Sequence, residues 1–105
     1  MASDALAYGI GSDIWPGLAK LVEEMGELQE LLGKVMASAG PAGTASATYW
    51  DGTNLRPRLI EEMGDVRAAI AFFAEANGFR SQDINDRADT KLGKFYYWHE
   101  EYSNG

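Results

Sequence analysis

An eight-residue segment that carries three acidic residues occurs twice in the chain, 38 residues apart. Residues 21–28 read LVEEMGEL and residues 59–66 read LIEEMGDV, with five of the eight positions identical. Two amphipathic helices of similar build would explain the repeated apolar positions. They would not require acid at the same three places twice. The repeat therefore predicts that carboxylates on two matched helices act together.

The acidic residues of the two segments fall in the same angular sector of their helices. At about 100° per residue, Glu24 and Glu27 lie to one side of the main apolar stripe of the first helix, as Glu62 and Asp65 do on the second. The apolar residues that share this sector are Leu31, Ala69 and Phe72. A solvated face would not carry them, so we expect the four acids at the margin of a second packed face.

Carboxylates gathered in a partly dry site repel one another and take up protons unless a cation compensates them. Oxygen ligands in i, i+3 pairs suit a hard cation, so we expect Mg²⁺, with Mn²⁺ as a substitute. Neither segment has the spacing of an EF-hand calcium loop. Gly26 and Gly64 each cost about 1 kcal/mol within a helix relative to Ala, which favours close helix approach at this place.

The composition excludes several other kinds of site. The chain has 105 residues, 46% of them hydrophobic, and a net charge of −7, as expected for one domain with its own core. The lack of Cys excludes disulfides, thiolate metal sites and Cys nucleophiles, and His99 alone cannot form a His-rich metal site. The acidic balance argues against a nucleic-acid partner. Phosphate chemistry would thus need a metal cation.

Apolar spacing predicts an all-α fold, a compact bundle of about three main helices. The first is expected to begin near Ser12, with Pro16 in or near its first turn, and to end near Ser38. The expected stripes of the first two helices are Leu18, Leu21, Val22, Met25, Leu28, Leu32 and Leu59, Ile60, Met63, Val66, Ile70, Phe73. The second helix should run from near Asn54 to Asn77–Gly78, and the third from Ser81 to about Tyr102.

The remaining segments complete a single domain over residues 1–105. Residues 95–98 are aromatic on every side of the third helix, which predicts a homodimer or a dimer of dimers. We expect residues 1–11 to be flexible and residues 39–53 to form a loop, in which Tyr49 and Trp50 either pack on the core or stack on a ligand. No targeting signal and no membrane-spanning run is visible, so a cytoplasmic location without membrane contact is expected.

The acidic segments resemble the E-E-x-x-E and E-x-x-D motifs of the all-α nucleoside triphosphate pyrophosphohydrolases, especially the MazG-like branch, to which dimeric dUTPases and dCTPases are related. The resemblance implies Mg²⁺-dependent cleavage of a nucleoside triphosphate into the monophosphate and pyrophosphate. By position, the implied metal ligands are Glu24, Glu27, Glu62 and Asp65. Glu24, assisted by Glu23, would orient or deprotonate the attacking water.

The same resemblance implies that the third helix holds the phosphates, through Lys91 and Arg87. Trp50 and Trp15 are candidates for stacking on the base, although stacking on Trp does not select one base. Lys20 lies four residues before Glu24, so an ion pair along the helix is expected there. Two other interpretations remain open: a non-catalytic helical interaction module, and a hydrolase of (p)ppGpp-type nucleotides.

Overall fold

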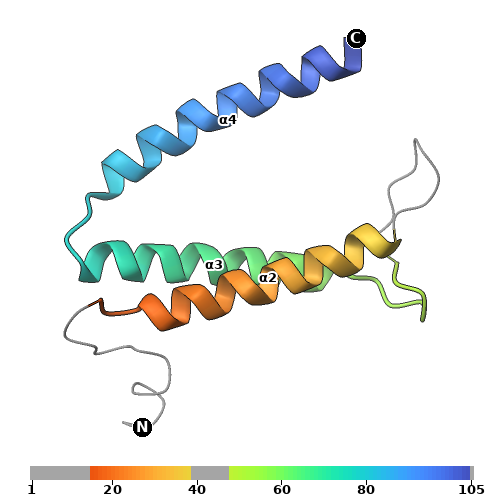
Figure 1. The fold of residues 1–105 in the computed structure, drawn as a ribbon, viewed down its shortest axis with the longest axis horizontal. Helices are drawn as coiled ribbons and strands as arrows, with labels where there is room; N and C mark the ends of the chain where they lie inside the picture. Colours follow the sequence, from red (N-terminus) through yellow and green to blue (C-terminus); the bar gives the residue numbers. More distant parts are fainter. Residues whose placement is uncertain (1–14, 39–47, 105) are drawn as a thin grey trace, which may run out of the picture.

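The computed structural model describes residues 15–38 and 48–104, and in these ranges the protein is all-helical. Three helices follow one another: α2 (Leu18–Ser38), α3 (Arg56–Ala76) and α4 (Ser81–Asn104). Figure 1 shows α2 and α3 side by side as an antiparallel hairpin. The described part of the chain contains no strand, only an isolated bridge between Thr48 and Asn54. The expected fold class is confirmed at this level; residues 1–11 and Ser12 lie outside the described ranges.

The start of α2 differs from the expectation. Residues 15–17 form a turn rather than helix, and the first helical residue is Leu18. Gly17 has φ +84°, a left-handed conformation that glycine adopts without strain. The turn is anchored to the end of α3, because the Asn77 side-chain amide donates to the Pro16 carbonyl at 3.0 Å. Pro16 therefore precedes the helix.

The ends of α3 follow the predicted signals closely. The Asn54 side chain accepts a hydrogen bond from the Arg56 amide at 3.0 Å, and Pro57 lies in the first turn. The helix ends at Ala76, and Gly78 has φ +77°. Just before α3, the Asp51 carboxylate accepts from the Thr53 amide at 3.0 Å, and the hydrogen bonds from Thr53 lower the pKa of Asp51. These turns fix where α3 begins and how the chain leaves it.

The face on which α2 meets α3 is not the main apolar stripe. The side chains buried between the helices are Leu31 and Ala69, together with Glu24 and Glu62. The predicted stripes stay largely open: Val22, Met25, Ile60 and Met63 are all more than half exposed. The second packed face expected around the acids is therefore the main contact of the hairpin.

The two glycines of the repeat, Gly26 and Gly64, do not mark close helix approach, contrary to the sequence interpretation. A side-chain carbon added at Gly26 or at Gly64 would meet no atom within 4 Å. Each of the two glycines is exposed and follows an exposed methionine, Met25 or Met63.

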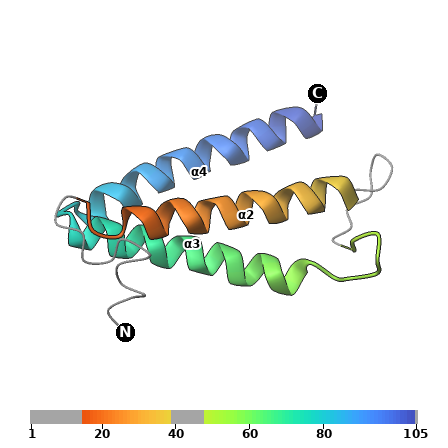
Figure 2. The same cartoon turned by 60° about the horizontal axis from the view of Figure 1, so that its bottom comes forward.

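Helix α4 diverges from the hairpin, so the chain alone is less compact than the predicted bundle. Its backbone comes close to that of α3 and not to that of α2. Figures 1 and 2 show it leaving the hairpin near its first residues and extending away to the C-terminus. Over residues 81–103, every residue is exposed except the half-buried Lys91. Among the described helices, none is long and apolar enough to cross a membrane.

Candidate metal centre

The hairpin brings three of the four predicted ligands together. Glu24 from α2 and Glu62 and Asp65 from α3 each offer a carboxylate oxygen, and these oxygens all lie within 4.8 Å of one another. The juxtaposition follows from the antiparallel packing, since each helix presents its acidic sector to the other. Asp65 is exposed and lies at the open side of the group, which we call the acidic triad.

The two glutamates of the triad are buried, each only 6% exposed. One oxygen of each is ion-paired: Lys20 Nζ lies 3.0 Å from Glu24 Oε1, and Arg58 Nη2 lies 3.3 Å from Glu62 Oε1. The second oxygen, Oε2, is buried in both residues without a hydrogen-bond partner. A buried carboxylate oxygen without a partner is costly. A cation held by both residues would satisfy the two oxygens at once.

Glu27, the fourth predicted ligand, lies outside the triad but next to it. It is exposed, and its pKa is raised above the ordinary value, mainly by the negative charge of Glu24, with smaller effects of desolvation and of Glu62. It lines a cavity that Glu62 also lines. Glu27 is therefore coupled electrostatically to the triad without being one of its three joined carboxylates.

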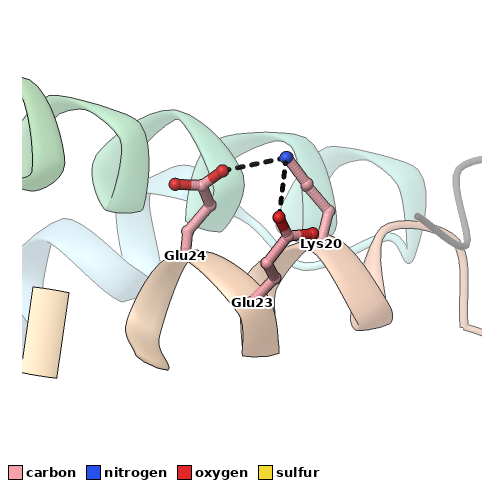
Figure 3. Close-up of polar contacts among 3 residues, drawn as sticks. All are labelled: Lys20, Glu23 and Glu24. Carbon is pink, nitrogen blue, oxygen red and sulfur yellow. Dashed lines mark ion pairs between the residues drawn. The ribbon is translucent and has the colours of Figure 1, made fainter. Parts of the chain in front are cut away.

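Glu23 immediately precedes Glu24 on α2 and is half-buried. Its carboxylate is 3.7 Å from Lys20 Nζ, so Lys20 bridges Glu23 and Glu24. Figure 3 shows the ammonium group between the two carboxylates. The ion pair expected between Lys20 and Glu24 is confirmed.

Two cavities flank the triad along the hairpin. One has a volume of about 340 Å³ and is lined by Gly17, Lys20, Glu24, Asp65, Ala68, Ala69 and Phe72. The other, about 260 Å³, is lined by Glu27, Glu30, Leu31, Lys34, Arg58 and Glu62. The first is mostly apolar apart from its acidic edge, and the second is mostly charged. A ligand that joins an apolar group to a charged chain could reach the triad from either end.

The donor set fits a hard divalent cation. Glu24, Glu62 and Asp65 supply oxygen ligands only, two of them buried and one open to solvent. Mg²⁺ is characteristically held by few carboxylates and completes its shell with water and substrate phosphate. Three carboxylates at one open-sided group suit that pattern.

The basic residues predicted to hold phosphates are not brought to the triad within one chain. Lys91 and Arg87 belong to α4, which diverges from the hairpin. Lys91 Nζ lies over the aromatic rings of its own helix, 5.7 Å from the centroid of Phe95 and 5.3 Å from that of Trp98. Arg87 lines a separate pocket beside Phe79 and Asp83.

The two candidate stacking residues lie at opposite ends of the hairpin. Trp15 stacks on Phe73 and Phe79, with ring centroids 5.8 and 6.5 Å apart, where α2 begins and α3 ends. Trp50 precedes α3 at the other end and is 84% exposed. Of the two roles considered for Trp50, packing on the core does not occur in this chain. Neither tryptophan lines the cavities beside the triad.

Sequence reasoning missed Arg58, the ion-pair partner of Glu62. The signal was present, because the repeat extends one residue before its acidic octet: Lys20 and Arg58 are also 38 positions apart. Phe72, which lines the apolar cavity, was recognised as part of the packed sector but not as a cavity residue. No protein family, curated protein or solved structure matches this chain in the comparisons made.

Proposed function

We propose that the protein is a Mg²⁺-dependent nucleoside triphosphate pyrophosphohydrolase. The observation that carries the proposal is the pair of buried glutamates whose second oxygens lack partners beside Asp65. A helical module without a ligand would gain stability by replacing such residues with apolar ones. The resemblance of the two acidic segments to the all-α pyrophosphohydrolases points to the same chemistry.

In this proposal, Glu24, Glu62 and Asp65 hold the cation, with Glu27 at the edge of the group. The cation, when bound, neutralises the polyphosphate and acidifies water. A water oxygen attacks the α-phosphorus, the bond from that phosphorus to the α–β bridging oxygen breaks, and pyrophosphate leaves. Glu24, with Glu23 next to it on α2, orients the water and accepts its proton.

The cavity bordered by Ala68 and Phe72 would receive the nucleoside. It adjoins Glu24 and Asp65, so a ligand bound there would reach the triad with its phosphates. Its apolar lining provides the ring of Phe72 for stacking and few hydrogen-bonding groups that could distinguish one base from another. We therefore expect activity on several nucleotides.

The decisive experiment is a panel of ribo- and deoxyribonucleoside triphosphates, with (p)ppGpp added, incubated with Mg²⁺ or Mn²⁺. Pyrophosphate and orthophosphate are measured separately. We expect pyrophosphate from at least one triphosphate, and loss of release by about a hundredfold or more in Glu24→Gln and Asp65→Asn. Glu101→Gln, a neutralisation on the exposed part of α4, is the control. No product from the panel, with no stabilisation by either cation, would favour the non-catalytic module.

We also propose that two copies associate through the open apolar face. This face runs along the predicted stripes of α2 and α3 and faces a cavity of about 640 Å³ shared with α4, lined by Met63, Ile70, Ile84 and others. Within the described residues, no large side chain is fully buried. Association that covers an open apolar face of that extent is favourable, and a second copy carries the same face.

The assembly is tested by light scattering across protein concentrations. We expect the mass of a dimer or a larger even assembly, and a shift towards the single chain in Met63→Asp, which charges the open face. Glu61→Gln, a neighbouring surface change, is the control. A single-chain mass at high concentration would contradict the proposal.

A further inference from the structure

Each buried glutamate of the triad is paired with a basic residue four positions before it. Lys20 Nζ lies 3.0 Å from Glu24 and Arg58 Nη2 lies 3.3 Å from Glu62. Both basic residues and both glutamates are related by the 38-residue repeat. The repeat thus contains the counter-ions as well as the carboxylates.

The two ion pairs leave the triad with an incomplete charge balance. The three carboxylates of the triad and Glu23, which also pairs with Lys20, face two basic side chains, so this group carries two negative charges. A divalent cation would cancel these two charges. With the glutamates bound to the cation, the two basic side chains would be left to attract phosphates, which the metal-free group repels.

Both basic side chains have room to change partner. The side chain of Lys20 is 30% exposed and that of Arg58 is 59% exposed, whereas the side chains of their glutamate partners are each 8% exposed. Lys20 lines the apolar cavity and Arg58 lines the charged one, so they lie at the two ends of the triad. Long, flexible side chains at a cavity edge can turn from a carboxylate to a bound anion.

We propose that Lys20 and Arg58 are exchangeable counter-ions of the centre. In the metal-free chain, each neutralises one buried glutamate. When a divalent cation binds the glutamates, each basic side chain turns to the phosphates of the ligand in the cavity that it lines. The second half of this inference rests on the proposed function, and the first half concerns the chain and the cation alone.

The test measures binding rather than turnover. Mn²⁺ is titrated by calorimetry into the wild type and into Lys20→Met, Arg58→Met and the double variant, at pH 7.5. Each ion pair competes with the cation, so we expect Mn²⁺ to bind about threefold more tightly in each single variant and about tenfold more tightly in the double variant. Inorganic tripolyphosphate, titrated at saturating Mg²⁺, should bind about tenfold more weakly to the double variant.

Matched controls separate charge exchange from loss of structure. Arg80→Met removes an exposed ion pair with Asp83, 3.9 Å long and remote from the triad, and should change neither affinity. Lys20→Arg and Arg58→Lys retain the charge and should behave as the wild type does. If the double variant fails to fold, the single variants carry the test.

The outcomes distinguish this inference from the proposed function. Unchanged or weaker Mn²⁺ binding in the variants would overturn the exchange and leave the ion pairs as structural contacts. Tighter Mn²⁺ binding with unchanged tripolyphosphate binding would overturn the phosphate role. If the variants show the expected changes in Mn²⁺ and tripolyphosphate affinity but the wild type releases no pyrophosphate, the exchange is supported and the proposed function is overturned. A wild type that binds no Mn²⁺ would overturn both.

Discussion

The two faces of the α2–α3 hairpin are buried in the opposite order from the one that their compositions suggest. The face around the triad carries four acidic residues, yet it contains the buried side chains Leu31, Ala69, Glu24 and Glu62. The opposite stripe is rich in Leu, Ile, Val and Met, yet Ile60 is 70% exposed and Leu32 is 43% exposed. The chain thus uses its internal contact for the candidate site and leaves its most apolar surface uncovered.

The hairpin meets two requirements, a rigid carboxylate site and cover for its apolar stripe, on two different faces. A carboxylate site needs rigid, partly dry walls, and direct packing of two helices from one chain supplies them. The apolar stripe needs only to be covered, which a second copy can do. Substitutions on the packed acidic face and on the open apolar face should therefore differ in the size of their effects and in the conditions under which they appear.

The largest expected effect comes from truncating the packed face. Leu31 is 3% exposed and lies beside Glu62, so Leu31→Ala should lower the free energy of unfolding by about 2–4 kcal/mol. The matched control is its neighbour, Leu32→Ala, on the open face. At low protein concentration, the control should cost less than about 1 kcal/mol in urea unfolding. Equal costs for the two variants would show that the faces do not differ as described.

The open face gives the next largest effect, which depends on protein concentration. In dilute solution, Ile60→Ala should change the free energy of unfolding little, because the side chain is exposed in the single chain. At concentrations where copies associate, the same variant should cost about 1–2 kcal/mol from lost apolar burial. The measurement is urea unfolding over a hundredfold range of concentration. A cost independent of concentration would contradict cover by a second copy.

Neutralising Asp65, the exposed member of the triad, should have a smaller effect on stability. It should raise the stability of the metal-free chain and reduce the stabilisation by Mg²⁺. Asp65→Asn removes one of three mutually repelling carboxylates, so the metal-free chain should gain about 0.5 kcal/mol of stability. The same variant should lose most of the stabilisation that Mg²⁺ gives to the wild type. Thermal unfolding with Mg²⁺ and with EDTA measures both. A variant stabilised by Mg²⁺ as strongly as the wild type would exclude Asp65 as a ligand.

The sequence predicted the elements well because their end signals are local. Asn77 and Gly78 end α3 and Ser81 begins α4, as expected. The start of α2 was misplaced because Trp15 and Gly17 are held by contacts with α3 that are distant in sequence: Trp15 stacks on Phe73, and the bond from Asn77 fixes the turn. No pattern within residues 12–18 contains that information.

The candidate site was predictable in its acids but not in its surroundings. The repeat of acid at matched positions grouped Glu24, Glu27, Glu62 and Asp65, and the structure joins all of them except Glu27. Periodicity could not predict which face of α2 packs against α3. The hydrophobic pattern shows how apolar each face is, but it does not show whether the other helix or a second copy covers that face. The position of Lys91 depends on the direction in which α4 leaves α3, which the short connection between them sets.

The smallest effect concerns Glu27, at the boundary between the acidic face and solvent, and it depends on pH. Its pKa is raised above the ordinary 4.5, chiefly by Glu24, so ionised Glu27 opposes folding. This cost is fully present above the raised pKa and disappears as the pH falls below 4.5, where folded and unfolded chains are both protonated. Glu27→Gln should therefore raise the urea midpoint at pH 7.5 and leave it unchanged near pH 4. Glu30→Gln, one turn further along α2, is the control at both pH values. A gain for Glu27→Gln that persists at pH 4 would assign the effect to local helix propensity, and the acidic face would then end at the triad.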